Sequence, residues 1–383
     1  MLTVADENMP FAAEAFGRLG EVRLAPGRKI TAETLAGADC LAVRSVTKVN
    51  EALLAGSSVR FVGTATIGTD HVDTQWLARA AIGFASAPGS NAVSVAEYVA
   101  ACLFELAGRL GLTLEGTSLG IVGCGNVGSQ VAARARALGM KVVVNDPPLA
   151  DRTGDPVYRP LEEALACDIV TLHVPLEKAG PYPTWHLADQ SFIGRMKPGA
   201  ILFNTSRGAV ADSNSLHRAL DSGRLSAVVL DVWEGEPEID TELLKKVTIA
   251  TPHIAGYSFD GKVRGTRMIY EAAGRHFGAE PDWDPSNLLP PPENTVIEIP
   301  GGAGRQAAVG LAVKKSYDIL ADDGRLRKIA GLPRGEQGKY FDGLRKTYPV
   351  RREWASRTVR LPAGMRELRS VFEGLDFRVE IMN

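Results

Sequence analysis

Three polar residues, Arg207, Glu236 and His253, each follow a short apolar run that is typical of a buried β-strand. The three runs are Ala200–Phe203, Ala227–Leu230 and Thr248–Ala250. An arginine can hold a carboxylate with two parallel hydrogen bonds, a histidine can take a hydroxyl proton near neutral pH, and a nearby glutamate favours the imidazolium form. Parallel strands bring such residues to the edge where open α/β sheets bind ligands. Beside a nicotinamide, this catalytic set would oxidise a 2-hydroxy acid, with His253 as the general base that accompanies hydride transfer from C2.

The segment Gly123-Cys-Gly-Asn-Val-Gly128 fits the glycine pattern of dinucleotide-binding turns. It follows the predicted strand Leu119–Val122 and opens the predicted helix Val127–Leu138, which is the context that the pattern needs. The first glycine would allow a tight turn, the second a close approach to pyrophosphate, and the third close packing of the helix on the strand. The expected cofactor contacts in this turn are Gly123, Gly125, Asn126, Val127 and Gly128.

Asp146 directly follows the next predicted strand, Lys141–Asn145. A carboxylate at that place accepts hydrogen bonds from the ribose hydroxyls and repels a 2′-phosphate. No arginine comes directly after it, because the next residues are Pro147 and Pro148. The sequence therefore predicts NAD rather than NADP as the cofactor.

The length of 383 residues suggests two or three domains. The 43 basic and 45 acidic residues give a net charge of −2, which argues against nucleic acid as a partner.

No apolar run reaches the ~18 residues of a membrane helix and the start of the chain lacks a secretion signal, so we expect a cytoplasmic protein without membrane contact. The four cysteines form no C-x-x-C pair and no zinc spacing, which predicts buried reduced thiols and no metal.

Short apolar runs alternate with helical stretches in the first ninety residues, which indicates a parallel sheet covered by helices. The predicted strands are Met1–Ala5, Cys40–Val43, Phe61–Gly63 and Phe84–Ala85, and the predicted helices are Phe11–Leu19, Ala52–Leu54 and Trp76–Ala80. A long helix over Ala92–Leu110 precedes a second block, whose six strands fit a Rossmann domain. Its other predicted elements are the helix Leu161–Ala166 and the strand Ile169–Leu172. A helix over Phe259–Phe277 is long enough to return the chain to the first block.

Prolines between Pro281 and Pro292 predict a boundary near residue 285, because proline continues neither a helix nor a central strand. The last hundred residues carry the expected elements Val296–Ile299, Gln306–Leu320, Gly338–Leu344 and Val371–Ile381. This segment contains no nucleotide motif, cysteine or histidine, so we expect its apolar surface to form a dimer interface. The pair Arg351-Arg352 would be a surface cluster or, across a two-fold axis, would approach the partner's anionic substrate.

Three sequence blocks resemble the signatures of the D-isomer-specific 2-hydroxyacid dehydrogenases. These blocks are 119–128, Asp168-Ile-Val-Thr-Leu-His-Val-Pro-Leu176 and Met196-Lys-Pro-Gly-Ala-Ile-Leu-Phe-Asn-Thr-Ser-Arg-Gly208. Arg207, Glu236 and His253 match the Arg–Glu–His set of that family. The resemblance implies an α/β fold in which a Rossmann NAD-binding domain (93–255) is inserted in a flavodoxin-like substrate domain (1–92 and 256–285). The α+β dimerisation domain would occupy 286–383.

Further segments resemble one branch of this family, which acts on a phosphorylated 2-hydroxy acid and forms homodimers through a C-terminal domain. These segments are Ala5–Pro10, Arg44–Asn50, Phe61–Asp73 and a long loop at Glu177–Thr184. The resemblance implies substrate contacts from Ser45, Thr66 and Tyr257. It implies cofactor contacts from Val174, Ser206, Arg207, Asp231 and Gly256. Val174 replaces the threonine expected at its position.

A phosphorylated hydroxy acid carries about three negative charges near pH 7, because the phosphate contributes roughly −1.5 to −2. Arg207 can serve one end only, so Arg44 and Lys48 are candidates for the phosphate, with solvated loop charges as the alternative. Two other functions fit the same residues. One is dehydrogenation of another hydroxy acid, such as 3-phosphoglycerate. The other is a dinucleotide-sensing binding protein without catalysis.

Overall fold

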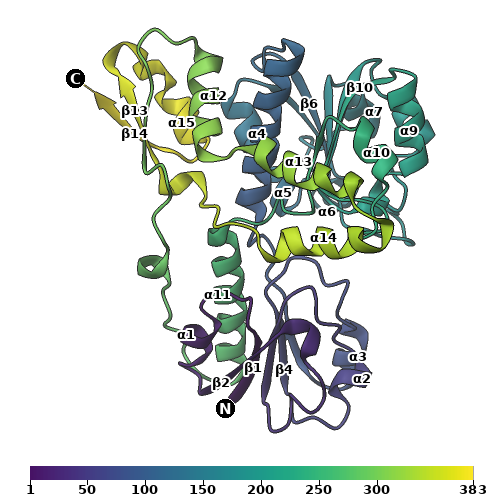
Figure 1. Ribbon diagram of the computed structural model, residues 1–383, viewed down its shortest axis with the longest axis vertical. Coiled ribbons are helices and arrows are strands. Elements are labelled where there is room, and N and C mark those ends of the chain that lie inside the picture. Colours follow the sequence, from purple (N-terminus) through teal and green to yellow (C-terminus); the bar gives the residue numbers. More distant parts are fainter. Residues whose placement is uncertain (383) are drawn as a thin grey trace. The chain divides into compact units, whose positions relative to one another are not determined.

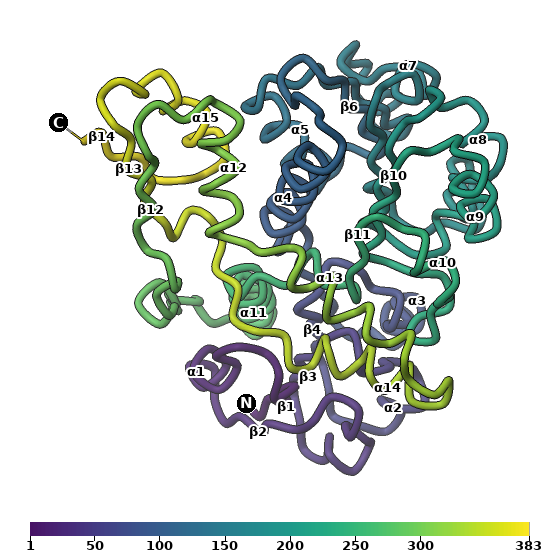
Figure 2. The backbone as a smooth tube through the Cα atoms, turned by 45° about the horizontal axis from the view of Figure 1, so that its top comes forward, coloured from purple at the N-terminus to yellow at the C-terminus, as the bar shows by residue number. Residues whose placement is uncertain are grey.

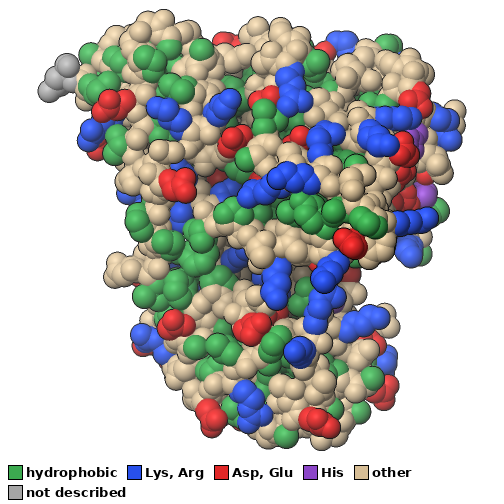
Figure 3. Space-filling model, in the orientation of Figure 1, with side chains coloured by type: hydrophobic (Ala, Val, Ile, Leu, Met, Phe, Trp, Pro, Cys, Tyr) green, Lys and Arg blue, Asp and Glu red, His purple; other side chains and the backbone are tan. Residues whose placement is uncertain are grey.

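The structure is a computed structural model that describes residues 1–382. The chain forms two compact units, Met1–Ala92 with Ser258–Pro291, and Val93–Tyr257 with the residues from Pro292 onward. The division into three domains with the boundaries given above stays a prediction. Among the described residues, no helix is both long and apolar enough to cross a bilayer. Acidic and basic side chains are interspersed over the face shown in Figure 3.

Five parallel strands form the sheet of the first unit, in the order β2-β1-β3-β4-β5 that is typical of flavodoxin-like folds. They are β1 (Leu2–Asp6), β2 (Glu21–Ala25), β3 (Cys40–Val43), β4 (Phe61–Thr64) and β5 (Gly83–Ala85). The helices are α1 (Ala12–Phe16), α2 (Glu51–Leu54), α3 (Thr74–Arg79) and α11 (Phe259–His276). A Cβ at Gly63 would lie 3.0 Å from Cβ of Ile269, so glycine lets α11 lie directly on β4.

Strand β2 was not predicted from the sequence. It lies at the edge of its sheet, and only Ala25 of its five residues is buried. An edge strand that faces solvent lacks the apolar run on which the other strand predictions rest. Helix α1 is also shorter than the predicted Phe11–Leu19.

Six parallel strands form the main sheet of the second unit, in the order β11-β10-β9-β8-β6-β7. They are β6 (Ser118–Val122), β7 (Lys141–Asn145), β8 (Ile169–Leu172), β9 (Ala200–Asn204), β10 (Leu225–Leu230) and β11 (Ile249–Ala250). All six predicted strands are therefore present. A single parallel bridge between Val144 and Tyr158 marks the place of the third strand of the usual Rossmann order.

Helices cover both faces of this sheet (Figures 1 and 2). Helices α4 (Ala92–Leu110) and α5 (Asn126–Ala137) lie on one face. The other helices of this part are α6 (Pro147–Thr153), α7 (Leu161–Leu165), α8 (Gln190–Arg195), α9 (Ser213–Asp221) and α10 (Thr241–Lys246). Alternate residues of the strands point into two separate apolar cores, so that Ile201 and Phe203 belong to one core and Leu202 to the other.

Residues 292–382, here called the C-terminal module, have an α+β fold with three parallel strands in the order β12-β13-β14. The strands are β12 (Val296–Glu298), β13 (Thr358–Pro362) and β14 (Arg378–Met382). The helices are α12 (Arg305–Ser316), α13 (Ile319–Arg327), α14 (Arg334–Lys346) and α15 (Arg369–Gly374). A Cβ at Gly374 would lie 2.6 Å from Cβ of Ala137, so α15 closely approaches α5.

Several expectations for this module are corrected by the structure. The segment Gln306–Leu320 is two helices, because α12 ends at Ser316 and Asp318 caps α13. Val371 lies in α15, and the last strand begins only at Arg378. Strand β13 was missed, although the alternation of its buried residues was the available signal.

The apolar residues of the module are covered by the same chain. Ile297, Val359 and Phe372 are almost fully buried in one core with residues of α4 and α5. These residues, which the sequence led us to expect in a dimer interface, are thus buried by α4 and α5 of the same chain. Dimer formation itself stays a prediction.

Candidate active site

The glycine turn between β6 and α5 has the geometry of a dinucleotide-binding loop. Gly123 has a φ of 89°, and a Cβ on it would lie 2.7 Å from the carbonyl oxygen of His173. A Cβ at Gly128 would lie 2.0 Å from the carbonyl oxygen of Gly123, so the helix can approach the strand only with glycine there. Gly125 has open space around its Cα, and no side chain caps the helix that it precedes. The turn thus leaves room and free N–H groups for a pyrophosphate.

Asn126 and Val127 are the first two residues of α5, as the predicted contacts with the cofactor require. Val174 touches the same turn, since its Cγ1 would lie 2.8 Å from a Cβ at Gly123. Its side chain is apolar, so it offers packing and no hydrogen bond at this place.

Asp146 follows β7 and faces the glycine turn. One carboxylate oxygen accepts the backbone N–H of Cys124 at 2.7 Å, and the other caps α6 by accepting the N–H of Leu149 at 3.0 Å. Each oxygen therefore keeps a lone pair for a further donor. The residues present fit NAD, because a half-buried carboxylate stands beside the turn that leaves room for the pyrophosphate.

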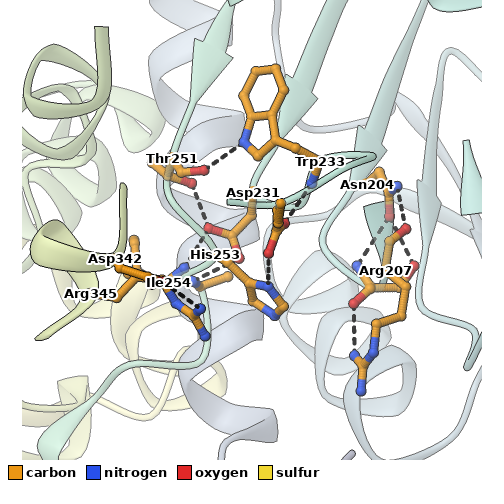
Figure 4. A network of polar contacts seen from close by, with 12 residues as sticks. Asn204, Arg207, Asp231, Trp233, Thr251, His253, Ile254, Asp342 and Arg345 are labelled. Carbon is orange, nitrogen blue, oxygen red and sulfur yellow. Dashed lines mark hydrogen bonds and ion pairs between the residues drawn. The ribbon is translucent and has the colours of Figure 1, made fainter. Parts of the chain in front are cut away.

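The three strands that precede the catalytic set end at the same level. The register pairs Leu230 of β10 with Asn204 of β9 and with Ala250 of β11. Arg207, Glu236 and His253 follow these ends and therefore share one edge of the sheet (Figure 4). A Cβ at Gly208 would lie 2.0 Å from the carbonyl oxygen of Trp233, so the loop of Arg207 lies directly against the loop that carries Glu236.

His253 and Glu236 form a hydrogen-bonded pair in this loop region. Nδ1 of His253 lies 2.8 Å from Oε2 of Glu236, and Oε1 of Glu236 accepts the N–H of Trp233 at 2.7 Å. Burial acts to raise the pKa of Glu236, but the charge and hydrogen bond of His253, the Trp233 N–H and the charge of Arg345 together hold it below its usual value. The glutamate is thus ionised, and Nε2 of the histidine is the nitrogen left for a substrate.

Asp231 fixes the loop that carries His253. Its carboxylate accepts the hydroxyl of Thr251 at 2.6 Å and the N–H groups of Ile254 and Ala255 at 2.8 and 3.0 Å. Its carbonyl oxygen accepts the N–H of His253 at 2.7 Å. Burial raises the pKa of Asp231, against the lowering effects of His253 and of these hydrogen bonds. The bonds hold His253 at a φ of 58°, a backbone conformation that non-glycine residues seldom adopt.

The neighbouring Glu234 is engaged elsewhere, which separates it from Glu236. Its Oε1 lies 2.5 Å from Nε2 of His186, and its Oε2 accepts the N–H of Ser213 at 3.1 Å. With Asp212, these side chains bring three possible metal ligands within 4.8 Å of one another. The Asp212 carboxylate already accepts the N–H of Ser215 and so caps α9. Sequence spacing did not predict this grouping.

A second histidine near the edge is unsuited to proton transfer. Burial lowers the pKa of His173 to about 3, so its ring is neutral. Both ring nitrogens lie within hydrogen-bond distance of threonine hydroxyls, at 2.9 Å from Thr171 and 3.2 Å from Thr205. Ser206 is buried beside them and bonds to the side chain of Asn204.

The remaining predicted substrate residues lie at strand ends of the first unit or close to the His253 loop. Val43 of β3 pairs with Thr64 of β4, so Arg44, Ser45 and Thr66 follow the ends of neighbouring strands. The hydroxyl of Thr66 donates to the carbonyl oxygen of Gly68 at 2.8 Å. Gly256 and Tyr257 belong to the second unit and follow the residues held by Asp231.

Arginines of the C-terminal module contact this loop or act on its charges. Arg351 is 6% exposed and donates to the carbonyl oxygen of Ala255 at 2.7 Å, and its Cζ lies 4.3 Å from the ring centroid of Tyr317. Arg352 is 8% exposed, so the expectation that this pair forms a surface cluster is wrong. A third arginine, Arg345 of α14, was not connected with catalysis from the sequence, and its charge acts on Glu236. No local sequence signal marks it, because only tertiary packing brings α14 to the loop.

The sequence matches known families in two parts. Residues 92–255 match the family described as "D-isomer specific 2-hydroxyacid dehydrogenase, NAD binding domain". Residues 288–371 match a domain of unknown function. Among solved structures, an NAD⁺-bound 3-phosphoglycerate dehydrogenase of Entamoeba histolytica is 25% identical, with a TM-score of 0.63 over 73% of this chain and 95% of that chain. A D-lactate dehydrogenase of Aquifex aeolicus, in complex with NAD and lactic acid, is 27% identical, with a TM-score of 0.57 over 72% of this chain and 95% of that chain.

Relatives of similar length share the C-terminal module as well. An erythronate-4-phosphate dehydrogenase of Escherichia fergusonii is 53% identical over 357 residues, which cover 93% of each chain. The enzyme of the same description from Shigella boydii is 52% identical over the same share. The chain therefore belongs to the erythronate-4-phosphate dehydrogenases, within the D-isomer-specific 2-hydroxyacid dehydrogenase family.

Proposed function

We propose that the protein oxidises 4-phospho-D-erythronate to (R)-3-hydroxy-2-oxo-4-phosphooxybutanoate with NAD, a step of pyridoxal 5′-phosphate synthesis. The observation that carries the proposal is the bond between His253 and Glu236, which leaves Nε2 of the histidine to face a substrate at the sheet edge that Arg207 shares. The identity of 53% over 93% of the chain supports the choice of substrate within the family.

Each residue of the catalytic set has a separate task in this reaction. The guanidinium of Arg207 holds the substrate carboxylate with two parallel hydrogen bonds. Nε2 of His253 accepts the proton of the C2 hydroxyl and returns it in the reverse direction. Glu236 holds the ring by Nδ1 and stabilises the positive charge that the ring gains.

NAD, bound at the glycine turn and beside Asp146, supplies the acceptor for the hydride that leaves C2. The backbone N–H groups at the start of α5 hold its pyrophosphate. Val174 and Ser206 pack beside it, and Asp231 and Gly256 line the nicotinamide side. Of these four, Asp231 acts mainly through the His253 loop, because three donors already occupy its carboxylate.

The substrate residues of the first unit are part of the proposal. Arg44, Ser45 and Thr66, at the carboxyl ends of β3 and β4, and Tyr257 of the second unit contact the phosphorylated acid. Their positions after neighbouring strand ends support this assignment, since open α/β sheets bind ligands at that edge.

A steady-state assay with NAD tests the function against its alternatives. We expect turnover of 4-phospho-D-erythronate with a kcat/KM far above that for 3-phosphoglycerate. A preference for 3-phosphoglycerate would assign the protein to another dehydrogenase. NAD binding without turnover of either acid would support the dinucleotide-sensing alternative.

We further propose a homodimer that forms through the C-terminal module. Val296 of β12 and Val350 before β13 remain 41% and 59% exposed, and β12 and β14 are the two edges of their sheet. Exposed strand edges and apolar side chains are features of self-association surfaces. Light scattering on the intact protein tests the proposal, and a monomer at micromolar concentration would reject it.

A further inference from the structure

Helix α14 of the C-terminal module is held against the loop that carries Glu236. Phe341 on this helix is fully buried in one core with Trp233 and Leu243. A Cβ at Gly338 would lie 2.1 Å from Oε1 of Glu238, so the helix also packs against the side chain of Glu238, two residues after Glu236. The position of α14 relative to the catalytic pair is thus fixed by packing within the second unit.

Arg345 projects from α14 one turn after Phe341 and lies beside Tyr257. Its guanidinium carbon is 5.8 Å from the ring centroid of Tyr257, and its side chain is 20% exposed. The charge of Arg345 contributes to the low pKa of Glu236. In the view of Figure 4, His253 lies between Arg345 and Arg207.

The guanidinium keeps a donor for a ligand. Its Nη1 lies 4.0 Å from Oδ1 of Asp342, and the side chain is also hydrogen-bonded with Tyr257, but Nε is buried without a hydrogen bond to any described residue. An arginine is always charged and its planar fork matches phosphate oxygens, so a partly buried arginine with a spare donor favours an anion.

We infer that Arg345 binds the phosphate of the substrate, so that the C-terminal module completes the active site of its own chain. The inference rests on the proposed function. Arg207 holds the carboxylate at one end of the acid, and Arg345 holds the phosphate at the other, with C2 over His253. Arg44 and Lys48 were the candidates from sequence, but only Arg345 belongs to the same compact unit as His253.

The test compares Arg345→Gln with Lys346→Gln, since Lys346 is the next residue on α14 and is exposed. For the intact protein with NAD, we expect Arg345→Gln to raise the KM for 4-phospho-D-erythronate by ~10–100-fold, the usual weight of a charged hydrogen bond. Competitive inhibition by inorganic phosphate should weaken by a similar factor. Inhibition by D-erythronate, which has no phosphate, should change less than about two-fold, and Lys346→Gln should match the wild type.

Two outcomes would overturn the inference. One is an unchanged KM for 4-phospho-D-erythronate in Arg345→Gln. The other is an equal weakening of inhibition by phosphate and by D-erythronate together with a shifted pH–rate profile, because the arginine would then only position Glu236 and Tyr257. If the Arg345→Gln variant no longer binds NAD, the Arg345→Lys variant is measured in its place. We expect the same loss of affinity for phosphate, with the affinity for D-erythronate kept. Wild-type protein that does not oxidise 4-phospho-D-erythronate would instead reject the proposed function. In that case the phosphate affinities of the two variants still decide whether Arg345 binds an anion.

Discussion

Nδ1 of His253 lies 2.8 Å from Oε2 of Glu236, whose other oxygen accepts the backbone N–H of Trp233 at 2.7 Å. The two bonds fix the carboxylate, and the carboxylate fixes the plane of the imidazole. Asp231 accepts the backbone N–H groups of His253 and of the two residues after it, so the backbone of the loop is held separately from the ring. The contacts of this chain alone therefore orient Nε2, the nitrogen that we propose accepts the proton.

Replacing His253 by Ala removes this proton acceptor. We expect kcat to fall by roughly 10²–10⁴-fold, the usual contribution of positioned proton transfer. NAD affinity should stay close to that of the wild type, because the glycine turn and Asp146 are untouched. Stopped-flow turnover and calorimetric titration with NAD measure the two quantities, and near-normal turnover would reject His253 as the base.

The change Glu236→Gln keeps the shape of the side chain and removes its charge. The glutamate stabilises the positive charge that the His253 ring gains with the proton of the substrate, so loss of the glutamate charge should lower kcat while the bond to Nδ1 is kept. Glu234→Gln is the matched control, since Glu234 bonds to His186 instead. A kcat of Glu236→Gln equal to that of the wild type would limit this glutamate to a structural role.

Asp146 is expected to set the preference for NAD. In Asp146→Ala the ribose hydroxyls lose their acceptor and a 2′-phosphate meets no negative charge, so the ratio of kcat/KM for NAD to that for NADP should fall. Part of the loss of NAD affinity in Asp146→Ala will come from a less well held glycine turn, because Asp146 also accepts the backbone N–H of Cys124 in that turn. Asp146→Asn keeps that acceptor and isolates the effect of charge, and an unchanged ratio in both variants would exclude the role.

Glu97 should make stability depend on pH. Burial, and next the charge of Glu353, raises the pKa of Glu97 to about 8 in the folded protein. The unfolded chain releases this proton near its ordinary value of about 4.3, so the stabilisation is complete below that pH and is lost as the pH rises towards 8. The slope is at most about 1.4 kcal/mol per pH unit.

The variant Glu97→Gln tests this dependence, since its amide oxygen can still accept the N–H of Trp354 that Glu97 binds at 2.7 Å. We expect the melting temperature of the variant to fall less than that of the wild type between about pH 5 and pH 8. Parallel curves for the two proteins would show that Glu97 does not titrate in this range.

The local sequence determined the six-stranded sheet of the second unit and indicated the candidate catalytic residues at its edge. The six strands are short, mostly buried apolar runs. Gly123 and Gly128 stand where the backbone must turn sharply or approach a neighbour closely. Both features leave a local pattern in the sequence. Arg207, Glu236 and His253 were proposed as a catalytic set because each follows such a strand, and the structure brings them to one edge of the sheet.

Only the tertiary structure revealed that the C-terminal module packs against the loops of this site. The burial of Arg351 and Arg352 and the approach of α14 to Glu236 depend on packing between residues about a hundred positions apart. Local periodicity carries no information about which helix will meet which loop, because that choice is made by the shape of the assembled core. Likewise, β2 is defined by its pairing with β1 rather than by its own exposed side chains.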